Sequence, residues 1–307
     1  MSSTLILQYI DYGLFPSKYY NGKNNIYIRN LFNNPNNIIT KIIRKIAFKA
    51  DLPILRFIFL HWIKLLDTVD TIIIFDNNYA PAVTNYIHKK YPNKRIIVWY
   101  WNSVDNTVDP MKFNRNYVEL WSFDEKDCEK YNLQFNTQFY CGENVKETSN
   151  TTNKGVLFIG VVKNKERLKL LQLLKNILDK SSINSFFYLV QGKEHYKNIK
   201  YYPEITYDKV AKLIENYECI LDITSSNQVG MSLRPLEALF FSKKLITNNP
   251  SILNSKLYNK NNVYYFNTNS VLGEDIKNFL ARPYDDTYSE QLKSYYSFEN
   301  WVKRFYE

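Results

Sequence analysis

The stretch that decides the fold is ILDITSSNQVGMSLRPLEAL, residues 220–239, which is followed closely by KKLITN, residues 243–248. Its first residues are apolar and β-branched, as in a buried strand, and they run into a polar loop that ends at Gly230. We expect a helix from Ser232 to Ser242 and a further strand from Lys244 to Thr247. Because a strand, a helix and a second strand form the building block of a parallel sheet, this stretch predicts an open α/β fold with a ligand site at the loop.

The loop and the start of its helix carry residue types that bind phosphate. The first N–H groups of a helix lack partners inside the helix and lie at the positive end of its dipole, so the turn before Ser232 favours an anion. Arg234 can donate two hydrogen bonds to a phosphate, and Glu237, three residues further along, can accept from both hydroxyls of a ribose. The alternative is that Ser232 only caps the helix and that Arg234 and Glu237 form an ordinary surface ion pair.

The rest of the chain shows the same alternation of short strands and amphipathic helices. The strands expected in the first half are Thr4–Tyr9, Thr71–Phe75, Arg95–Trp101, Val118–Ser122 and Gln134–Tyr140. Those in the second half are Val156–Val161, Ser185–Val190, Ile199–Tyr202, Glu218–Thr224, Lys244–Thr247 and Val263–Phe266. The helices expected between them are Ile38–Leu66 (broken near Pro53), Ala82–Lys90, Glu125–Tyr131, Glu166–Leu178, Tyr207–Tyr217 and Leu272–Leu280.

A polar stretch without apolar periodicity, Glu143–Lys154, separates these two halves and is the expected linker. The sequence therefore predicts two domains, residues 1–148 and residues 149–295, each with a Rossmann-like sheet and facing each other across a cleft. Residues 296–307 read as an amphipathic helix.

The segments quoted above resemble the donor-binding segment of GT-B glycosyltransferases, in particular of bacterial enzymes that build lipopolysaccharide and capsular polysaccharide. The resemblance rests on RPLEAL (234–239) before KKLIT (243–247), on WSFDEKD (121–127) and on FIGVVKNKER (158–167), and so spans most of the chain. It implies that the first domain binds the acceptor, that the second binds a nucleotide sugar, and that the C-terminal helix crosses back onto the first domain. Many retaining members have a glutamate eight residues before the one matched by Glu237; here that position is Val229, and the stereochemistry stays open.

The resemblance also implies roles for individual residues. The backbone amides of Gly230, Met231 and Ser232 would hold the diphosphate, and Glu237 the ribose. Cations after the tight turn at Gly160, chiefly Lys163 and Arg167, would neutralise the departing nucleoside diphosphate. Gln191 and Ile205 would lie near the nucleotide base. For the cations, the alternative is a solvated helix start, although cations there oppose the helix dipole.

An inverting transfer would need a general base in the first domain. Asp11, just beyond the first strand, is the preferred candidate, and Asp76 and Asp105 compete with it because they also follow predicted strands. Aspartates at strand ends are also common turn formers, which is the simpler interpretation of all three.

Charge points to an anionic partner. The 40 Lys and Arg exceed the 30 Asp and Glu, for a formal charge of +10. Residues 40–64 contain six basic residues and one acid amid Ile, Leu, Phe and Trp, which suits contact with an anionic membrane surface, although a solvated amphipathic helix fits nearly as well. No P-loop, G-x-G-x-x-G, G-x-S-x-G, D-x-D or C-x-x-C motif occurs, so we expect neither a bound metal nor another cofactor.

The sequence thus predicts a metal-independent, cytoplasmic glycosyltransferase, peripheral at the inner face of the cell membrane. It would move a hexose, with a UDP-hexose as the expected donor, onto a growing lipid-linked glycan of lipopolysaccharide or capsule type. One alternative is a basic, aromatic-rich nucleic-acid-binding protein, since the chain has 26 Tyr and 19 Phe. Another is a GT-B-like subunit that supports a partner enzyme without catalysis.

Overall fold

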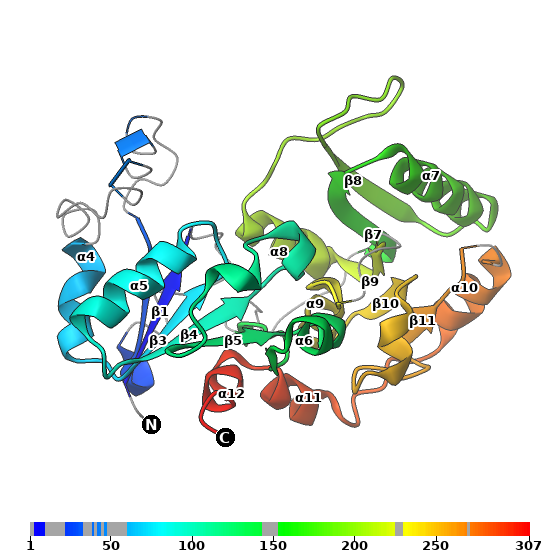
Figure 1. Cartoon of the computed structure of the whole chain (residues 1–307). Coiled ribbons are helices and arrows are strands. Elements are labelled where there is room, and N and C mark those ends of the chain that lie inside the picture. The colour runs from blue at the N-terminus through cyan, green and yellow to red at the C-terminus, as the bar shows by residue number, and fades with distance from the viewer. Residues whose placement is uncertain are drawn as a thin grey trace. The chain divides into compact units, whose positions relative to one another are not determined.

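The computed structural model describes residues 3–9, 22–32, 39, 42–43, 46–47, 60–142, 153–224, 230–268 and 271–307. The chain divides into two compact units, Met1–Thr137 and Gln138–Glu307 (Figure 1). The division falls ahead of the stretch expected as the linker, of which residues 143–152 lie outside the described residues.

The first unit is built on a six-stranded parallel sheet with the strand order β2-β1-β3-β4-β5-β6. Its strands are β1 (Thr4–Gln8), β2 (Ile26–Asn30), β3 (Thr71–Phe75), β4 (Arg95–Tyr100), β5 (Val118–Ser122) and β6 (Gln134–Phe135). β3 and β5 coincide with the predicted strands, whereas β2 was missed because it follows a stretch rich in Asn and Lys.

The α-helices of this unit with given bounds are α4 (Leu60–Ile63), α5 (Ala80–Lys90) and α6 (Glu125–Tyr131), and residues 39, 42–43 and 46–47 are also helical. Short 3-10 helices cover Lys23–Asn25, Lys64–Asp67, Val104–Asn106 and Pro110–Lys112. α5 packs on the sheet through Ala80, Val83 and Ile87, which are fully buried in one core with alternate residues of the central strands, such as Ile72 and Ile74. α6 starts where predicted because the Asp124 carboxylate accepts from the backbone N–H groups of Lys126 and Asp127.

The second unit is built on a five-stranded parallel sheet with the order β11-β10-β9-β7-β8. Its strands are β7 (Asn153–Val162), β8 (Ser185–Gln191), β9 (Tyr217–Asp222), β10 (Lys244–Thr247) and β11 (Val263–Tyr265). Its helices are α7 (Lys165–Lys180), α8 (Tyr207–Asn216), α9 (Arg234–Phe240), α10 (Gly273–Ala281), α11 (Ser289–Tyr295) and α12 (Phe298–Lys303), with a 3-10 helix at Pro250–Asn254.

The apolar stripe of α7 explains how this sheet is covered. Leu171, Leu174 and Leu178 recur at helical spacing and are buried against β7 and β9 residues such as Phe158 and Leu221. The side chain of Asn164 accepts from the backbone N–H of Arg167 and so starts the helix directly after β7. Gly160, Lys163 and Arg167 are thereby brought to the carboxyl edge of the second sheet.

Several predicted elements were wrong in extent, among them two strands and the helix that follows Gly230. The strand expected over Gln134–Tyr140 ends at Phe135, and Tyr140 instead forms a single bridge with Ser297. The strand expected over Ile199–Tyr202 is reduced to one bridge between Val190 and Tyr202. The helix expected from Ser232 begins at Arg234, because Ser232 lies outside it with its hydroxyl bound to Asp222.

The predicted C-terminal helix is present as α12 and belongs to the second unit. Its Phe298 and Trp301 rings pack on Phe139, with centroid distances of 5.3 and 4.3 Å. Among the described residues, no helix combines the length and apolar character that crossing a bilayer requires.

Candidate functional site

A cavity of about 220 Å³ opens at the carboxyl ends of β7 and β9 in the second unit. Five of the residues predicted to bind the donor line it: Gly160, Lys163, Arg167, Ser232 and Arg234. The other lining residues are Phe158, Ile159, Leu221, Asp222, Ile223 and Thr224. The lining carries three cations and one carboxylate, so its formal charge is 3 − 1 = +2. A concave, positively charged site at this edge of a parallel sheet suits an anionic ligand.

Arg167 has a donor ready for such a ligand. One terminal nitrogen donates to the carbonyl oxygen of Ile223 at 2.5 Å, while the buried Nε has no hydrogen-bond acceptor among the described residues. Because a buried unpaired donor is costly, an acceptor such as a phosphate oxygen would satisfy it. Gly160 leaves space for this guanidinium, since a Cβ there would lie 3.4 Å from Arg167 and 3.0 Å from the Phe158 ring.

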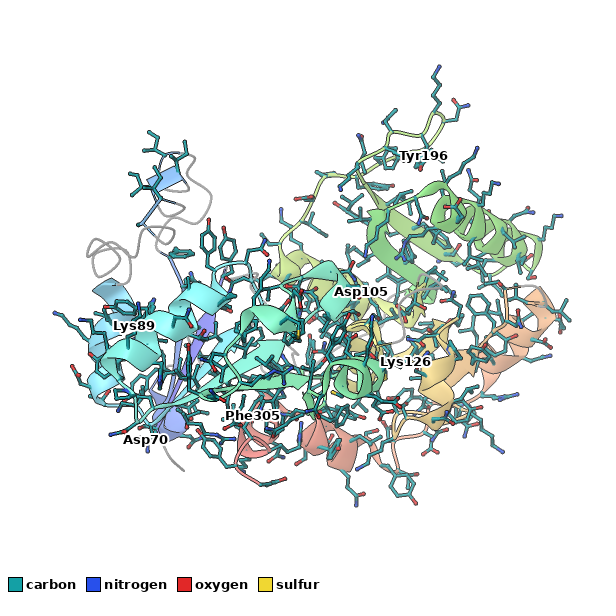
Figure 2. The ribbon with its side chains drawn as sticks, in the orientation of Figure 1. Asp70, Lys89, Asp105, Lys126, Tyr196 and Phe305 are labelled. Carbon is teal, nitrogen blue, oxygen red and sulfur yellow. The ribbon has the colours of Figure 1, made fainter. Side chains whose placement is uncertain are left out.

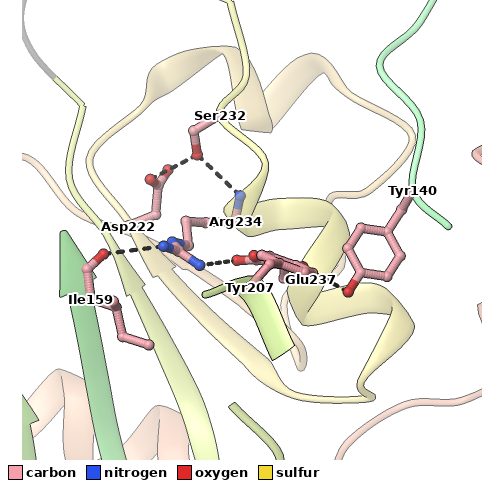
Figure 3. Close-up of polar contacts among 7 residues, drawn as sticks. All are labelled: Tyr140, Ile159, Tyr207, Asp222, Ser232, Arg234 and Glu237. Carbon is pink, nitrogen blue, oxygen red and sulfur yellow. Dashed lines mark hydrogen bonds and ion pairs between the residues drawn. The ribbon is translucent and has the colours of Figure 1, made fainter. Parts of the chain in front are cut away.

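Arg234 is held by a chain of buried contacts (Figure 3). Its guanidinium forms an ion pair with Glu237 and also donates to the carbonyl oxygen of Ile159 at 3.2 Å. The Tyr207 hydroxyl donates to the other Glu237 oxygen at 2.9 Å, and the Tyr140 hydroxyl lies 2.7 Å from that of Tyr207. The Glu237 side chain is 1% exposed, whereas that of Arg234 is 22% exposed. The charge that reaches the cavity is therefore the guanidinium, with the carboxylate behind it.

These contacts shift the pKa values of Arg234, Tyr140 and Tyr207. Burial alone would lower the pKa of Arg234, but the neighbouring Glu237 carboxylate raises it, so the guanidinium stays charged. Burial raises the pKa of both Tyr140 and Tyr207, and the charge of Glu237 raises each further. Both phenols thus remain neutral hydrogen-bond donors.

Asp222, the last residue of β9, lines the cavity. It is 3% exposed and accepts hydrogen bonds from the hydroxyls of Ser232 at 2.9 Å and Thr247 at 3.0 Å. Burial raises the pKa of Asp222, and the two hydroxyls and the nearby Arg234 and Arg167 oppose that rise. Ser232 also accepts from the backbone N–H of Arg234 at 3.2 Å, so Asp222 fixes the turn that enters α9.

Five predicted donor-binding residues are absent from the cavity lining: Gln191, Ile205, Gly230, Met231 and Glu237. Glu237 is engaged by Arg234 and Tyr207, so the ribose contact predicted for it stays a prediction. Gln191 is exposed at the end of β8 and lies 3.2 Å from the His195 ring. Gly230 is buried and follows residues 225–229, which lie outside the described residues.

Among the residues of this site that sequence reasoning missed are Asp222, Thr224 and Tyr207. Asp222 and Thr224 lie in the quoted stretch, and their position after a buried strand was a usable signal. Tyr207 gave no signal, because it reaches Glu237 from α8, 30 residues earlier in the chain.

A second cavity of about 340 Å³ lies in the same unit, and none of the predicted site residues lines it. It is bordered by Lys243 and Leu245 near the start of β10 and by Asn262 and Val263 near the start of β11, with Tyr258, Tyr284 and Tyr288 around it. Ligands of open parallel sheets bind at the carboxyl ends of strands, and this cavity lies at the amino ends. The smaller cavity therefore remains the candidate site.

The candidate bases belong to the first unit. Asp11 lies outside the described residues. Asp105, which is labelled in Figure 2, has a side chain that is 75% exposed, lies 3.7 Å from Lys130 and accepts from the Tyr131 hydroxyl. Asp76 directly follows β3 and is partly exposed. Within the described ranges, no group of three or more His, Cys, Asp or Glu is arranged to hold a metal ion.

Comparison with known proteins finds solved structures of similar architecture. No family model matches the chain, and no curated protein does. Among solved structures, the apo form of the lipopolysaccharide outer core galactosyltransferase WaaB is similar at a TM-score of 0.55 and 13% identity, covering 99% of this chain and 98% of that one. AviGT4, a glycosyltransferase involved in avilamycin A biosynthesis, is similar at a TM-score of 0.53 and 8% identity, covering 78% of this chain and 84% of that one. The predicted fold is confirmed: the chain has the α/β architecture of the GT-B glycosyltransferases.

Proposed function

We propose that this protein is a glycosyltransferase that takes a sugar from a nucleotide donor held at the β7 and β9 edge of the second unit. The observation that carries the proposal is the convergence of Lys163, Arg167 and Arg234 on one cavity at the carboxyl ends of parallel strands. A diphosphate carries at least two negative charges and many acceptor oxygens, which matches a lining of net charge +2 with an unpaired buried donor.

The chemistry of the site follows from where charge accumulates. When the bond between sugar and diphosphate breaks, negative charge builds on the leaving phosphate. Fixed guanidinium groups stabilise that charge more in the transition state than in the bound donor. Arg167 and Arg234 are suited to this because both are already oriented by backbone carbonyl groups, of Ile223 and Ile159 respectively. Glu237 acts through Arg234, which it keeps charged and in place.

We propose a UDP-hexose as donor and a growing lipid-linked glycan as acceptor, without a metal ion. Among the proteins of similar fold, WaaB is described as a lipopolysaccharide outer core galactosyltransferase. That description supports a hexose and a cell-surface glycan for this chain. The backbone amides of Gly230, Met231 and Ser232 remain the proposed contacts to the diphosphate, and Gln191 and Ile205 the proposed contacts to the nucleotide base.

Peripheral membrane contact through residues 40–64 is part of the same proposal. Most of that range lies outside the described residues, but Ile42, Ile43 and Ile46 are described as helical and are 57%, 43% and 55% exposed. Their spacing puts them on one helical stripe, interleaved in the sequence with Lys41, Arg44 and Lys45. Exposed apolar residues within a basic segment favour binding to anionic lipid.

The membrane proposal is tested by sedimentation with vesicles that contain or lack phosphatidylglycerol at moderate salt. We expect binding only to the anionic vesicles and its loss on combining Ile42→Asn with Ile46→Asn. Met111→Asn is the matched control, because Met111 is 83% exposed elsewhere in the first unit. Equal sedimentation of the parent and the double variant would contradict contact through this stripe.

A thermal-shift panel of UDP-, GDP-, CDP- and dTDP-sugars tests the function itself. We expect a UDP-hexose to raise the melting temperature of the parent and to have little effect on Arg167→Gln. Lys169→Gln is the matched control, since Lys169 is an exposed cation on the same helix that does not line the cavity. A shift with single-stranded oligonucleotides and none with any nucleotide sugar would favour the nucleic-acid-binding alternative.

A further inference from the structure

The cavity of about 340 Å³ in the second unit shares no lining residue with the smaller cavity proposed to hold the donor, the donor cavity. Its volume falls in the range of small-ligand cavities, about 300–1,000 Å³. One helix borders both cavities: α9 contributes Arg234 to the donor cavity and Pro235, Ala238 and Leu239 to the larger one. Because the two linings are separate, the larger cavity can take a ligand of its own while the donor cavity is filled.

Apolar side chains and tyrosine rings make up one part of the lining of the larger cavity. Leu239, Leu245 and Val263 belong to it and are almost fully buried. Tyr258 and Tyr288 belong to it as well, yet their side chains are 43% and 61% exposed. A ligand that covered these rings would remove apolar surface from water. The C–H face of a sugar ring suits this contact, because its weakly positive hydrogens meet the negative face of an aromatic ring.

The polar part of the lining is built around Asp285. One carboxylate oxygen of Asp285 accepts from the Asn259 amide at 2.9 Å, and the other accepts from the backbone N–H and the hydroxyl of Thr287 at 3.0 and 2.6 Å. The Asn262 side chain donates to the Asp285 carbonyl oxygen at 2.7 Å and accepts from its backbone N–H at 2.8 Å. These contacts order the polar groups before a ligand binds, which lowers the entropy cost of binding.

The same groups keep hydrogen-bonding capacity for a ligand. A carboxylate has about four acceptor sites, and the contacts with Asn259 and Thr287 use three of those of Asp285. An asparagine amide has two N–H donors, and Asn259 and Asn262 each use one in these contacts. Hydrogen bonds from Thr287 and Asn259 lower the pKa of Asp285 to about 2, so its carboxylate is an ionised acceptor at neutral pH. Sugar hydroxyls, which both donate and accept, match this set of groups.

The charges of the lining favour a neutral ligand over a phosphate. Its cations are Lys243 and Lys256, and its carboxylate is Asp285. The Lys243 ammonium is directed to the Glu215 carbonyl oxygen at 2.8 Å, and that of Lys256 lies 4.0 Å from the centre of the Tyr295 ring. Neither of these two partners lines the cavity. Both ammonium groups thus have contacts outside the lining, whereas the ionised Asp285 within it would repel an anion.

We propose that this cavity is a second ligand site, which binds a neutral hexose residue of a glycan. Tyr258 and Tyr288 contact the C–H face of the sugar ring. The Asp285 carboxylate and the amides of Asn259 and Asn262 bind its hydroxyls. The site is separate from the donor cavity, and binding there does not depend on the proposed function.

Saturation-transfer difference NMR of the full chain tests the site with the methyl glycosides of glucose, galactose and mannose and with lactose and maltose. We expect transfer to the ring C–H protons of at least one of these sugars, whose Kd is then found by titration. Tyr288→Ala should raise that Kd about tenfold and Tyr288→Phe less than about twofold, because the ring face makes the contact. Tyr196→Ala is the matched control, since Tyr196, labelled in Figure 2, is a partly exposed tyrosine of the same unit outside the lining.

Asp285→Asn and Asp286→Asn form a second pair of variants. Asp286 is the exposed neighbour of Asp285 and does not line the cavity. Asp285→Asn should raise the sugar Kd about tenfold, because hydrogen bonds to a charged acceptor are lost, and Asp286→Asn should leave it unchanged. Because the Tyr288 side chain is largely exposed, Tyr288→Ala keeps the fold and tests the site even if Asp285→Asn lowers the melting temperature.

The sugar titration is repeated in the presence of saturating UDP, and we expect the same Kd. The proposal would be overturned by any of three results: no transfer from the parent to any of these sugars, an unchanged Kd in Tyr288→Ala, or displacement of the sugar by UDP. Sugar binding by a protein that binds no UDP or nucleotide sugar would support the second site and overturn the proposed function.

Discussion

Arg234 and Glu237 form a buried ion pair one helical turn apart, and only the arginine faces the cavity. A glutamate at this position was expected to hold a ribose, which stays a prediction; in the structure its carboxylate is shared between Arg234 and Tyr207. On the proposed function, Glu237 is a positioning residue, whose effect on the ligand passes through the guanidinium. A charged pair that is pinned by a phenol and a backbone carbonyl moves little when ligand binds, which favours transition-state stabilisation.

Glu237→Gln separates the positioning role from a direct ribose contact. We expect it to weaken UDP binding about tenfold and to lower the free energy of unfolding by about 1–3 kcal/mol, because a buried charge loses its partner. The ratio of affinities for UDP and for 2′-deoxy- and 3′-deoxy-UDP, measured by calorimetry, should be the same in parent and variant. If Glu237 bound the ribose directly, that ratio would fall towards one in the variant.

Tyr207→Phe is the control for this measurement. It removes one hydrogen bond to Glu237 and leaves both charges, so UDP affinity should fall only two- to fivefold, as expected for about 0.5–1 kcal/mol. A Tyr207→Phe variant as weak as Glu237→Gln would mean that the phenol, rather than the carboxylate, orients Arg234.

Much of the fold could be predicted from sequence because parallel strands are buried and read as apolar runs. Thr71–Phe75, Val118–Ser122 and Lys244–Thr247 were found to the residue. The strand predicted over Gln134–Tyr140 was too long because its polar and aromatic residues alternate as in a strand. In the structure the backbone N–H of Tyr140 donates instead to the carbonyl oxygen of Tyr296, 156 residues away. Such a long-range partner leaves no local pattern.

The residues of the candidate site could be predicted where loops and cations follow strands. They could not be predicted where tertiary packing determines how deeply a side chain is buried. Ser232 and Arg234 were named from position and charge, and Gly160, Lys163 and Arg167 were named with the help of the resemblance; all five meet in one cavity. The depth of Glu237 depends on Tyr207 and Tyr140 closing over it, and the three residues are joined only by tertiary packing. Helical spacing predicted on which face of α9 Glu237 lies, but not which residues cover that face.

Arg167→Lys distinguishes geometry from charge in the cavity. Lysine keeps the positive charge but lacks an Nε donor and cannot also bind the Ile223 carbonyl oxygen in the same plane. We expect a loss of UDP affinity of about tenfold for Arg167→Lys and about 10–100-fold for Arg167→Gln, measured by calorimetry. Equal affinities for the parent and Arg167→Lys would show that charge alone is needed there.

Asp76→Asn should stabilise the protein at neutral pH. The pKa of Asp76 is raised from 3.8 to about 6 in the folded state, so the folded protein holds a proton between these pH values that the unfolded chain has lost. Stability from this group is therefore present below about pH 4 and is lost as pH rises through 6. Tyr100, the titratable group whose pKa is raised by Asp76, donates its hydroxyl to the Val108 carbonyl oxygen and stays neutral over this range.

The melting temperature of Asp76→Asn minus that of the parent should accordingly be larger at pH 8 than at pH 4.5. Asp70→Asn should show no such change between these two pH values, because hydrogen bonds from Ser3 lower the pKa of Asp70 from 3.8 and its stabilisation is lost only as pH falls below about 4. A gain for Asp76→Asn that is independent of pH would mean that the carboxylate is not desolvated in the folded protein.

The most direct measurement is a crystal structure of the protein with UDP bound. We predict that phosphate oxygens lie within hydrogen-bonding distance of the Arg167 Nε and the Arg234 guanidinium, with Glu237 still paired to Arg234. A diphosphate bound elsewhere, for instance in the cavity beside Tyr258 and Tyr284, with the β7 and β9 edge empty, would contradict the assignment of the site.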